Sequence, residues 1–309
     1  MSEKIVILGV FVADTSYRAD RAPRIGETIL GNSFALGPGG KGSNQAVAAA
    51  KAGGQVHFLS KLGEDPFADM ALATWKEAGV IPEVTHHAEH YTGAAYIFIE
   101  DATGNNAIIV CPGVAATISP ADIEAKAELI ASSSVFVTQL EQPMDAALRG
   151  LEIARKGGAQ TILNPAPAAE LPAGMLALCS FVTPNETEAE AITGVSVKTI
   201  DEARIAAGIL LEKGVGAAII TLGERGVLYH DHTQSVHVPA FYAGPVVETT
   251  GAGDAFNGGF AAALSTGMTP VEAVKFGNAT AAISVTRPGT APSMPSLSEI
   301  QSLLTKTHA

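Results

Sequence analysis

Cysteine and tryptophan are scarce in this 309-residue chain, which has two cysteines and one tryptophan. Cys111 and Cys179 lie far apart in the sequence and form no Cys-x-x-Cys pair, which argues against a disulfide scaffold and against a zinc ribbon. Two reduced thiols are typical of a cytoplasmic protein, and we expect that location.

Basic residues are also few, with 19 Lys and Arg against 31 Asp and Glu, and the net charge is −12. An acidic chain repels the phosphate backbone of nucleic acids, so no nucleic-acid partner is expected. A polyanionic substrate would need a local electropositive site, or would have to arrive with a metal ion.

No apolar run approaches the roughly 20 residues that span a bilayer, so no membrane partner is expected. The apolar stretch at residues 5–13 lacks the positive flank of a signal peptide, because Glu3 offsets the charge of Lys4. Phe11 also stands where such a peptide would carry a small residue. We interpret the stretch as a buried first strand.

The chain is rich in apolar residues (47%) and has 32 glycines, which is typical of a well-buried α/β protein. Its length predicts one large domain with a smaller piece attached. Apolar strands alternate with helical stretches, which predicts a mostly parallel sheet with helices on both faces. The predicted strands are Ile5–Val10, Val56–Lys61, Val135–Thr138, Thr161–Leu163, Phe181–Thr183 and Ala217–Leu222. Ligands of such sheets bind at the carboxyl ends of the strands, where Gly9, Asn164, Pro184 and Gly223 lie.

A second, smaller sheet is predicted from three other segments. Thr28–Leu36 and Ala94–Glu100 have β-rich patterns, and a polar turn joins the second of these to Ala107–Cys111 as a hairpin. Because no helical pattern separates Asp14 from Leu36, we expect these strands to form a sheet of their own.

The segment Gly37–Gly42 matches the dinucleotide fingerprint G-x-G-x-x-G, but it does not follow the first strand of a β-α-β unit. It is not a phosphate-binding Walker loop either, because residues 35 and 42 are Ala and Gly. What remains is a glycine-rich loop with one lysine, Lys41, leading into a predicted helix at Gly42–Ala52. Its exposed N–H groups suit hydroxyls or phosphate oxygens, although a simple tight turn is the alternative.

The segment Thr249–Gly258 carries the strongest chemical signal. Gly251 and Gly253 leave backbone N–H groups uncovered just before an apolar helical run, which predicts an anion hole at a helix N-terminus. Asp254 lies in the first turn of that helix. It either complements the helix dipole or accepts a proton while the glycines hold developing negative charge, as a phosphoryl acceptor requires.

Three further patterns have a plain structural interpretation beside a functional one. Asn185-Glu-Thr-Glu188 fits a capping box, and Glu188 could instead lie near Mg²⁺ through a water molecule. Thr221–Gly226 fits a hairpin turn, and its small residues could instead support a nucleotide. His86, His87 and His90 suggest metal ligands, but we predict a solvated loop at Thr85–Thr92 because no supporting ligand pattern accompanies them.

The chain resembles ribokinases within the ribokinase/PfkB family of carbohydrate kinases over nearly its whole length. The motifs that carry the resemblance are Gly39-Gly-Lys-Gly-Ser-Asn44, Asn164-Pro-Ala-Pro, Asn185-Glu-Thr-Glu188 and Gly251-Ala-Gly-Asp254. Each is moderately specific, and all four in this order are highly specific. The resemblance implies a Rossmann-like α/β domain (residues 1–11, 38–92 and 112–309) and a β-sheet lid (12–37 and 93–111) that forms a homodimer.

The resemblance also implies MgATP as the phosphoryl donor, K⁺ as an activator and a set of site residues. Asp254 would be the catalytic base, beside an anion hole formed by Gly251, Ala252 and Gly253. The sugar would be held by Asp14, Gly40, Lys41, Asn44 and Glu141, and the nucleotide by Asn185, Thr221, Gly223, Gly226 and Asn278. Glu188 would lie near Mg²⁺, and K⁺ would be held around Glu248, Thr250, Ser284, Arg287, Gly289 and Ser293.

Two residues depart from the family pattern. Ribokinases usually carry Asn where this chain has Val12, and Asp where it has Glu248. We expect an ATP-dependent kinase for the 5-hydroxyl of a pentose, with D-ribose first. Alternatives are a kinase for 2-deoxyribose or a ketohexose, a dinucleotide oxidoreductase, and a non-catalytic sugar-binding protein.

Overall fold

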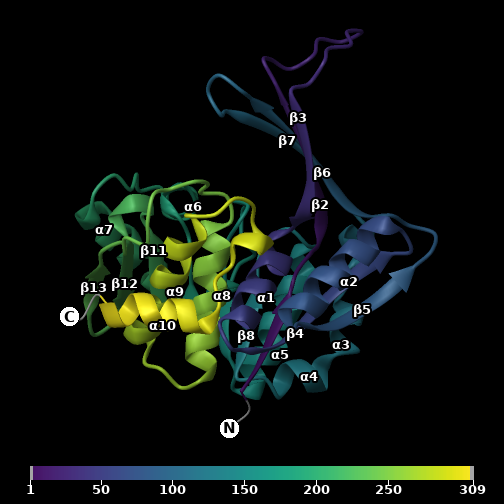
Figure 1. The fold of residues 1–309 in the computed structure, drawn as a ribbon. Helices are drawn as coiled ribbons and strands as arrows, with labels where there is room; N and C mark the ends of the chain where they lie inside the picture. Colours follow the sequence, from purple (N-terminus) through teal and green to yellow (C-terminus); the bar gives the residue numbers. More distant parts are fainter. Residues whose placement is uncertain (1–2, 307–309) are drawn as a thin grey trace.

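A nine-stranded sheet forms the body of the protein in a computed structural model that describes residues 3–306 (Figure 1). Its strands are β1 (Lys4–Leu8), β4 (Gln55–Gly63), β5 (Ile81–His87), β8 (Val135–Thr138), β9 (Gln160–Leu163), β10 (Phe181–Val182), β11 (Ala217–Thr221), β12 (Val227–Asp231) and β13 (Ser235–Val238). Their order is β13-β12-β11-β10-β9-β8-β1-β4-β5. From β5 to β11 all neighbours are parallel, and β12 and β13 are antiparallel.

Helices cover both faces of this sheet because its strands are apolar on both sides. Along β1, Ile5 and Ile7 pack into one core cluster, whereas Val6 and Leu8 pack into the other. The first cluster is closed by α1 (Lys41–Lys51), α2 (Pro66–Ala78), α8 (Ala252–Ser265), α9 (Pro270–Ser284) and α10 (Leu297–Lys306). The second is closed by α3 (Pro120–Glu124), α4 (Ala127–Ala131), α5 (Met144–Gly157), α6 (Glu186–Thr193) and α7 (Ile200–Glu212).

Four short 3-10 helices lie in the connections: η1 (Val114–Thr117), η2 (Leu176–Leu178), η3 (Gly223–Arg225) and η4 (Ala291–Ser293). Within residues 3–306, none of the helices combines the length and the apolar character that crossing a bilayer requires.

A separate four-stranded sheet, the lid, stands out from the body (Figure 1). It consists of β2 (Val12–Ala19), β3 (Ser33–Gly39), β6 (Thr92–Glu100) and β7 (Asn106–Gly113), in the order β3-β2-β6-β7. The central pair β2 and β6 is parallel, and both outer pairs are antiparallel. Residues 9–11 lead from β1 into the lid, and Gly40 leads from β3 into α1. The lid is therefore joined to the body beside the carboxyl end of β1.

The predicted α/β class, with helices on both faces of the main sheet and a separate small sheet, is confirmed. Two local predictions were wrong. Residues 28–32 lie outside any strand, and β3 begins at Ser33 instead of Thr28. His86 and His87 lie in the edge strand β5 rather than in a solvated loop, since backbone pairing with β4 overrides their polar character.

Gly9 and Gly42 allow β1 and α1 to approach closely. A Cβ atom added at Gly9 would lie 2.7 Å from the Cα atom of Gly42 and 2.6 Å from Oε1 of Gln139. Neither residue can carry a side chain without moving backbone, and this contact places the start of α1 over the end of β1.

We expect Gly9→Ala to lower the free energy of unfolding by about 1–3 kcal/mol, because it overpacks this contact. The matched control is Gly208→Ala in α7, where an added Cβ would meet nothing within 4 Å. That variant should gain about 0.5–1 kcal/mol, since Ala is the better helix former. Urea unfolding measures both changes, and equal effects in the two variants would contradict the close approach.

Candidate functional site

Asp254 lies at the start of α8, where the chain enters the helix through a glycine turn. Gly251 is the residue before the helix and has a φ of 81°, which favours glycine. Asp254 is in the first helical turn, as the sequence predicted, and only 7% of its surface is exposed. The carboxylate is thus held inside the protein at the positive end of the helix dipole.

Two side chains from α1 hold the Asp254 carboxylate. Asn44 Nδ2 donates to Asp254 Oδ2 and Gln45 Nε2 donates to Asp254 Oδ1, each at 3.0 Å. Burial raises the pKa of Asp254, while the positive charge of Lys41 and the two amide donors oppose that rise. The arrangement provides a buried carboxylate with a nearby cation, which is suited to accepting a proton.

The N-terminus of α8 is open beside this carboxylate. No side chain caps it, and a Cβ added at Gly253 would meet nothing within 4 Å. The first N–H groups of an α-helix have no partner within the helix. The Ala252 N–H donates to the Thr249 carbonyl at 3.1 Å, and the helix start at Gly251 and Gly253, both of which line the cavity described next, suits an anion. A cavity of about 160 Å³ lies here, lined by Lys41, Asn164, Ala166, Thr183, Asn185, Glu188, Thr221, Gly251, Gly253, Asp254 and Asn257.

The predicted sugar-binding residues come from β2 of the lid, from the start of α1 and from the loop after β8. A Cβ added at Gly39 would lie 2.2 Å from Oδ2 of Asp14, so a glycine in β3 makes room for the Asp14 carboxylate. Gly40 turns the chain with a φ of 87°. The backbone N–H of Lys41 then donates to Oε2 of Glu141 at 2.8 Å, while Oδ1 of Asn44 is buried without a partner among residues 3–306. That oxygen fits a ligand hydroxyl.

Three carboxylates crowd this region. Burial, followed by the charge of Asp254, raises the pKa of Asp14 to about 6. Burial raises the pKa of Glu141 to about 7, the charges of Asp254 and Asp14 add to the rise, and Lys41 opposes it. At neutral pH the site therefore stores mutual repulsion that a polar ligand with donor groups would relieve.

The burial of these carboxylates, together with their mutual repulsion, should appear as a pH dependence of stability. The folded-state pKa values of Asp14 and Glu141 lie above their ordinary values of 3.8 and 4.5, so the folded state binds these protons more tightly. Their contribution is fully present below about pH 4 and is lost as the pH rises to about 7. The pKa of Glu299 is lowered to about 2, so its contribution to the free energy of unfolding is lost only as the pH falls from about 4.5 toward 2.

We expect Glu141→Gln to reduce the loss of unfolding free energy between pH 5 and pH 8 by about 2–3 kcal/mol. Glutamine keeps an oxygen that can accept from Lys41 but cannot ionise. The control is Glu190→Gln on the exposed surface of α6. Urea unfolding at both pH values decides, and the same pH slope in wild type and Glu141→Gln would contradict the burial of a strained carboxylate.

Of the predicted nucleotide and Mg²⁺ residues, Asn185, Glu188 and Thr221 line this cavity, whereas Gly223, Gly226 and Asn278 do not. Asn185 and Glu188 form a capping box, which confirms the structural interpretation of this motif. Glu188 uses Oε2 for that bond, at 2.9 Å from the Asn185 nitrogen, which leaves Oε1 outside the box. Asn185 pairs with Thr221 in a parallel bridge, and a Cβ added at Gly223 would meet nothing within 4 Å. These backbone surfaces are open.

The hairpin predicted at residues 221–226 is confirmed, because β11 and β12 are antiparallel on either side of it. Gly226 has a φ of 93°, and a Cβ there would lie 2.1 Å from the carbonyl oxygen of Val238. Asn278 is not among the residues that line the cavity, and its Nδ2 donates to the Pro239 carbonyl at 2.8 Å. It therefore holds the loop that follows β13.

The residues predicted around K⁺ come from residues 248–250 and from the segment between the end of α9 and η4. The backbone N–H groups of Val247 and Glu248 both donate to the carbonyl of Val285. Oε2 of Glu248 accepts from the N–H of Gly289 at 2.9 Å. The hydroxyls of Ser284 and Ser293 donate to Ala281 and Thr290, and the Arg287 side chain pairs with Glu299, so Arg287 offers this region only its backbone. Thr250 directly precedes Gly251, which lines the cavity.

Several polar residues of the site were missed by sequence reasoning. Gln45 contacts Asp254, Gln139 contacts Gln45, and Thr183 Oγ1 donates to Asn257 Oδ1 at 2.7 Å. Gln139 and Thr183 directly follow or end predicted strands, so the carboxyl-end rule could have found them. Gln45 and Asn257 lie inside helices, where the sequence gives no sign that they face a carboxylate or a loop.

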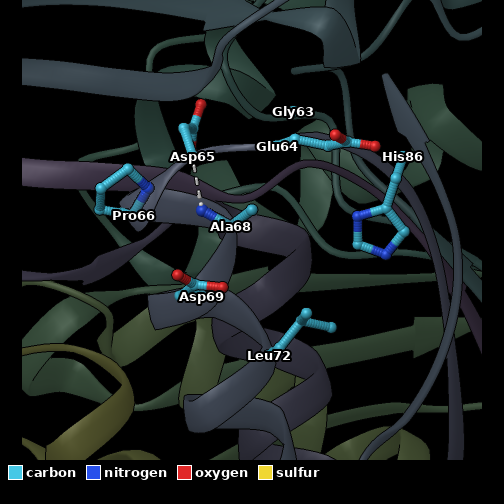
Figure 2. Close-up of a pocket in the computed structure, with 8 residues that line it drawn as sticks. All are labelled: Gly63, Glu64, Asp65, Pro66, Ala68, Asp69, Leu72 and His86. Atoms are coloured by element: carbon cyan, nitrogen blue, oxygen red, sulfur yellow. Dashed lines mark hydrogen bonds between the residues drawn. The ribbon is translucent and has the colours of Figure 1, made fainter. Parts of the chain in front are cut away.

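A second, more open cavity of about 490 Å³ lies at the N-terminus of α2 and shares no lining residue with the first (Figure 2). Glu64, Asp65, Asp69 and His86 line it. Both carboxylate oxygens of Asp65 already accept hydrogen bonds there, from the N–H groups of Ala68 at 2.9 Å and Thr92 at 2.6 Å. We place the chemistry in the smaller cavity, since only that one combines a carboxylate, a lysine and an open helix N-terminus.

Comparison with known proteins gives consistent results. A family model described as pfkB family carbohydrate kinase matches residues 2–297. The chain is 38% identical to the deoxyribokinase of Salmonella typhi over 97% of this chain and 98% of that protein. It is 36% identical to the ribokinase of Haemophilus influenzae over 97% of both chains. The structure of Arabidopsis thaliana ribokinase complexed with ribose and ATP superposes with a TM-score of 0.92 at 28% identity, covering 98% of this chain and 99% of that one.

Proposed function

The chain belongs to the pfkB family of carbohydrate kinases and is therefore a phosphotransferase, and we propose that it transfers the γ-phosphoryl group of MgATP to the 5-hydroxyl of a pentose, with D-ribose as the first acceptor. One observation carries this proposal. Asp254 lies beside the uncapped N-terminus of α8 in a single cavity that Lys41 also lines. A base and an anion hole at the same point are what phosphoryl transfer to a hydroxyl needs.

In the proposed reaction Asp254 accepts the proton of the sugar hydroxyl as that oxygen attacks phosphorus. At the start of α8 the N–H groups of Gly251 and Gly253 hold the negative charge of the transferred group, beside Ala252, whose N–H donates to the Thr249 carbonyl. Asp14, Gly40, Lys41, Asn44 and Glu141 hold the sugar hydroxyls. When bound, MgATP supplies the phosphoryl group and a metal ion that neutralises its charge.

The donor side of the cavity suits a nucleotide. We propose that Asn185, Thr221, Gly223, Gly226 and Asn278 line the nucleotide site, with Glu188 near Mg²⁺ through a water molecule. The open backbone at Gly223 and Gly253 supports this assignment, because nucleotide oxygens need close approach to main-chain N–H groups. We further propose a K⁺ site around Glu248, Thr250, Ser284, Arg287, Gly289 and Ser293, supported by the pairing of Glu248 with Gly289.

The experiment that tests the function is ATP turnover on a panel of sugars, run in K⁺ and in a large organic cation. We expect phosphorylation of D-ribose, with a higher rate in K⁺. Turnover of hexoses alone would contradict the pentose assignment, and equal rates in both cations would contradict the K⁺ site. Binding of sugar without any turnover would identify a binding protein instead.

A second candidate acceptor is 2-deoxyribose, and Val12 is the observation that favours it. Val12 and Asp14 are alternate residues of β2 and so lie on one face of the lid. Val12 is only 5% exposed and belongs to the same apolar core cluster as Ala95 and Ala115, and its side chain offers no hydrogen bond to a sugar. One of the relatives is named a deoxyribokinase. A sugar lacking one hydroxyl would lose less at such a surface.

We expect Val12→Asn to raise the preference for D-ribose over 2-deoxyribose by about tenfold, measured as the ratio of the two kcat/KM values. An amide at this position could bond the extra hydroxyl, and about 1.4 kcal/mol corresponds to that factor. Val12→Leu is the matched control, because it changes volume without adding a hydrogen-bonding group. An unchanged ratio in Val12→Asn would show that residue 12 does not face the sugar.

We also propose that the protein is a homodimer joined through the lid. One face of the lid carries Tyr17, Phe34, Leu36, Tyr96 and Ile109, which are between 37% and 63% exposed. The ring centroids of Tyr17 and Phe34 lie 5.1 Å apart, and those of Tyr17 and Tyr96 lie 5.4 Å apart. These three rings therefore form a continuous apolar surface. An exposed apolar sheet face of this kind is typical of an interface.

A further inference from the structure

A chain of amide side chains reaches Oδ1 of Asp254, while Asn44 contacts the other oxygen, Oδ2. Gln139 Nε2 donates to Gln45 Oε1 at 2.7 Å. Gln45 Nε2 in turn donates to Asp254 Oδ1 and to Asn164 Oδ1, both at 3.0 Å. Gln45 and Gln139 have no exposed surface, and Asn164 is 7% exposed. The chain connects the ends of β8 and β9 and the helices α1 and α8.

The direction of every donor in this chain is determined by its partners. Nδ2 of Asn164 donates to the Thr183 carbonyl at 3.2 Å, so its Oδ1 must face Gln45. An ionised carboxylate only accepts hydrogen bonds, so two acceptors, Asp254 and Asn164, face the amide of Gln45 and require its nitrogen there. The carbonyl of Gln45 then faces Gln139, which must donate. A reversed Gln45 amide would place oxygen against two oxygens.

The body of the protein holds Gln139 in this place. Its Oε1 lies where a Cβ on Gly9 would come within 2.6 Å and one on Gly42 within 2.9 Å. The amide of Gln139, the last member of this chain of amides, therefore lies against the close contact of β1 and α1. That oxygen has no hydrogen-bond partner among residues 3–306. Leaving a buried oxygen unsatisfied lowers the free energy of unfolding.

We propose that Gln45 is a positioning residue for Asp254, held in a single amide orientation by Gln139 and Asn164, so that its donor anchors Oδ1 of the carboxylate. This inference rests on the proposed role of Asp254 as the base. Neither glutamine touches the substrate in this scheme. Both act through the Asp254 carboxylate. Asn164 of the Asn-Pro-Ala-Pro motif belongs to the same chain of amides, as an acceptor for Gln45.

The charges that face Asp254 bear on any test by pH. Lys41 from α1 favours the ionised carboxylate. Asp14 from β2, Glu141 after β8 and Glu188 from α6 each have a pKa that the charge of Asp254 raises, so they disfavour it in return. Gln45 is the donor that holds Oδ1 against this repulsion. Losing it should raise the pKa of Asp254 and weaken its placement.

The test compares Gln45→Met and Gln139→Met with Gln142→Met. Gln142 is also a buried glutamine in the loop after β8, but it donates to Thr138 and to the Gln139 carbonyl and not toward Asp254. We expect Gln45→Met to lower kcat about 10-fold to 10²-fold with KM for the sugar within about threefold. The acid limb of its kcat profile should move up by about one pH unit. Gln142→Met should leave that limb unmoved.

Gln139 acts only through Gln45, so its effect should be absent in the Gln45→Met background. The double-mutant cycle measures this, and additive losses in kcat would overturn the relay. A higher KM for the sugar in Gln45→Met, with the acid limb of its kcat profile unmoved, would also overturn the inference.

A second measurement does not depend on turnover. The ¹³C carboxyl signal that disappears in Asp254→Asn reports the ionisation of Asp254 in the unliganded protein. Its pKa should be higher in Gln45→Met than in wild type, and Gln139→Met gives the same readout if Gln45→Met fails to fold. An unchanged titration in both overturns the inference. If wild type phosphorylates no sugar, the proposed function fails, and this titration still decides whether the glutamines position Asp254.

Discussion

Asp254→Asn is expected to lower kcat by about 10²–10⁴-fold while sugar binding changes little, which is the typical contribution of a general base. Asparagine has nearly the same shape but cannot take the proton. It also cannot accept from both neighbouring amides through two oxygens, because Asn44 and Gln45 each donate to a different oxygen of Asp254. Single-turnover phosphorylation and calorimetric titration with the sugar measure the two effects separately.

An electrostatic consequence provides an independent check on the same variant. The charge of Asp254 helps to raise the pKa values of Asp14 and Glu141. Removing that charge should lower both, and it should relieve part of the repulsion in the empty site. If kcat of Asp254→Asn stays within a few-fold of wild type, Asp254 only complements the dipole of α8, and the proposed mechanism is wrong.

The second large effect is expected at the lid. Ile109→Glu should weaken the proposed dimer about 10²-fold to 10³-fold, because it buries an unpaired carboxylate in an apolar interface. A two-fold symmetric contact would place the substitution on both subunits and so double its cost. Ile205→Glu on α7 is the matched control, since Ile205 is 58% exposed and Ile109 is 63% exposed.

Sedimentation equilibrium across the micromolar range measures this change. We expect wild type and Ile205→Glu to remain dimers where Ile109→Glu is monomeric. A monomeric wild type at micromolar concentration contradicts the lid interface. Equal association in all three proteins would place the interface elsewhere on the surface.

Sequence reasoning reached the fold because the strands of the body are short apolar runs with clear boundaries. Ile5 to Leu8 and Val135 to Thr138 are buried on both faces, and such runs are hard to mistake when helical patterns separate them. It was less successful in the lid. β2 reads Val-Ala-Asp-Thr-Ser-Tyr-Arg-Ala, and its pairing with β3 and β6 compensates for a polar composition that predicts no strand by itself.

The candidate site shows the same division. Asp254 could be found because glycines and a helix start surround it in sequence. Gln45 could not be assigned to it, because 209 residues separate the two and only the packing of α1 against α8 brings them together. Roles that depend on contacts between distant elements have no local pattern to reveal them.

The order of the main sheet has a consequence for how enzymes of this architecture diversify. β1, β4 and β5 come from the first part of the chain, β8 to β13 come from the rest, and the two groups meet where β1 lies beside β8. The proposed acceptor residues all lie between Asp14 and Glu141, and the proposed donor residues lie between Asn185 and Asn278. On this proposed assignment, mutations that change which sugar is taken would fall in one contiguous stretch of the gene. Selection can revise that stretch, or recombination can replace it, while the machinery that handles ATP is inherited unchanged.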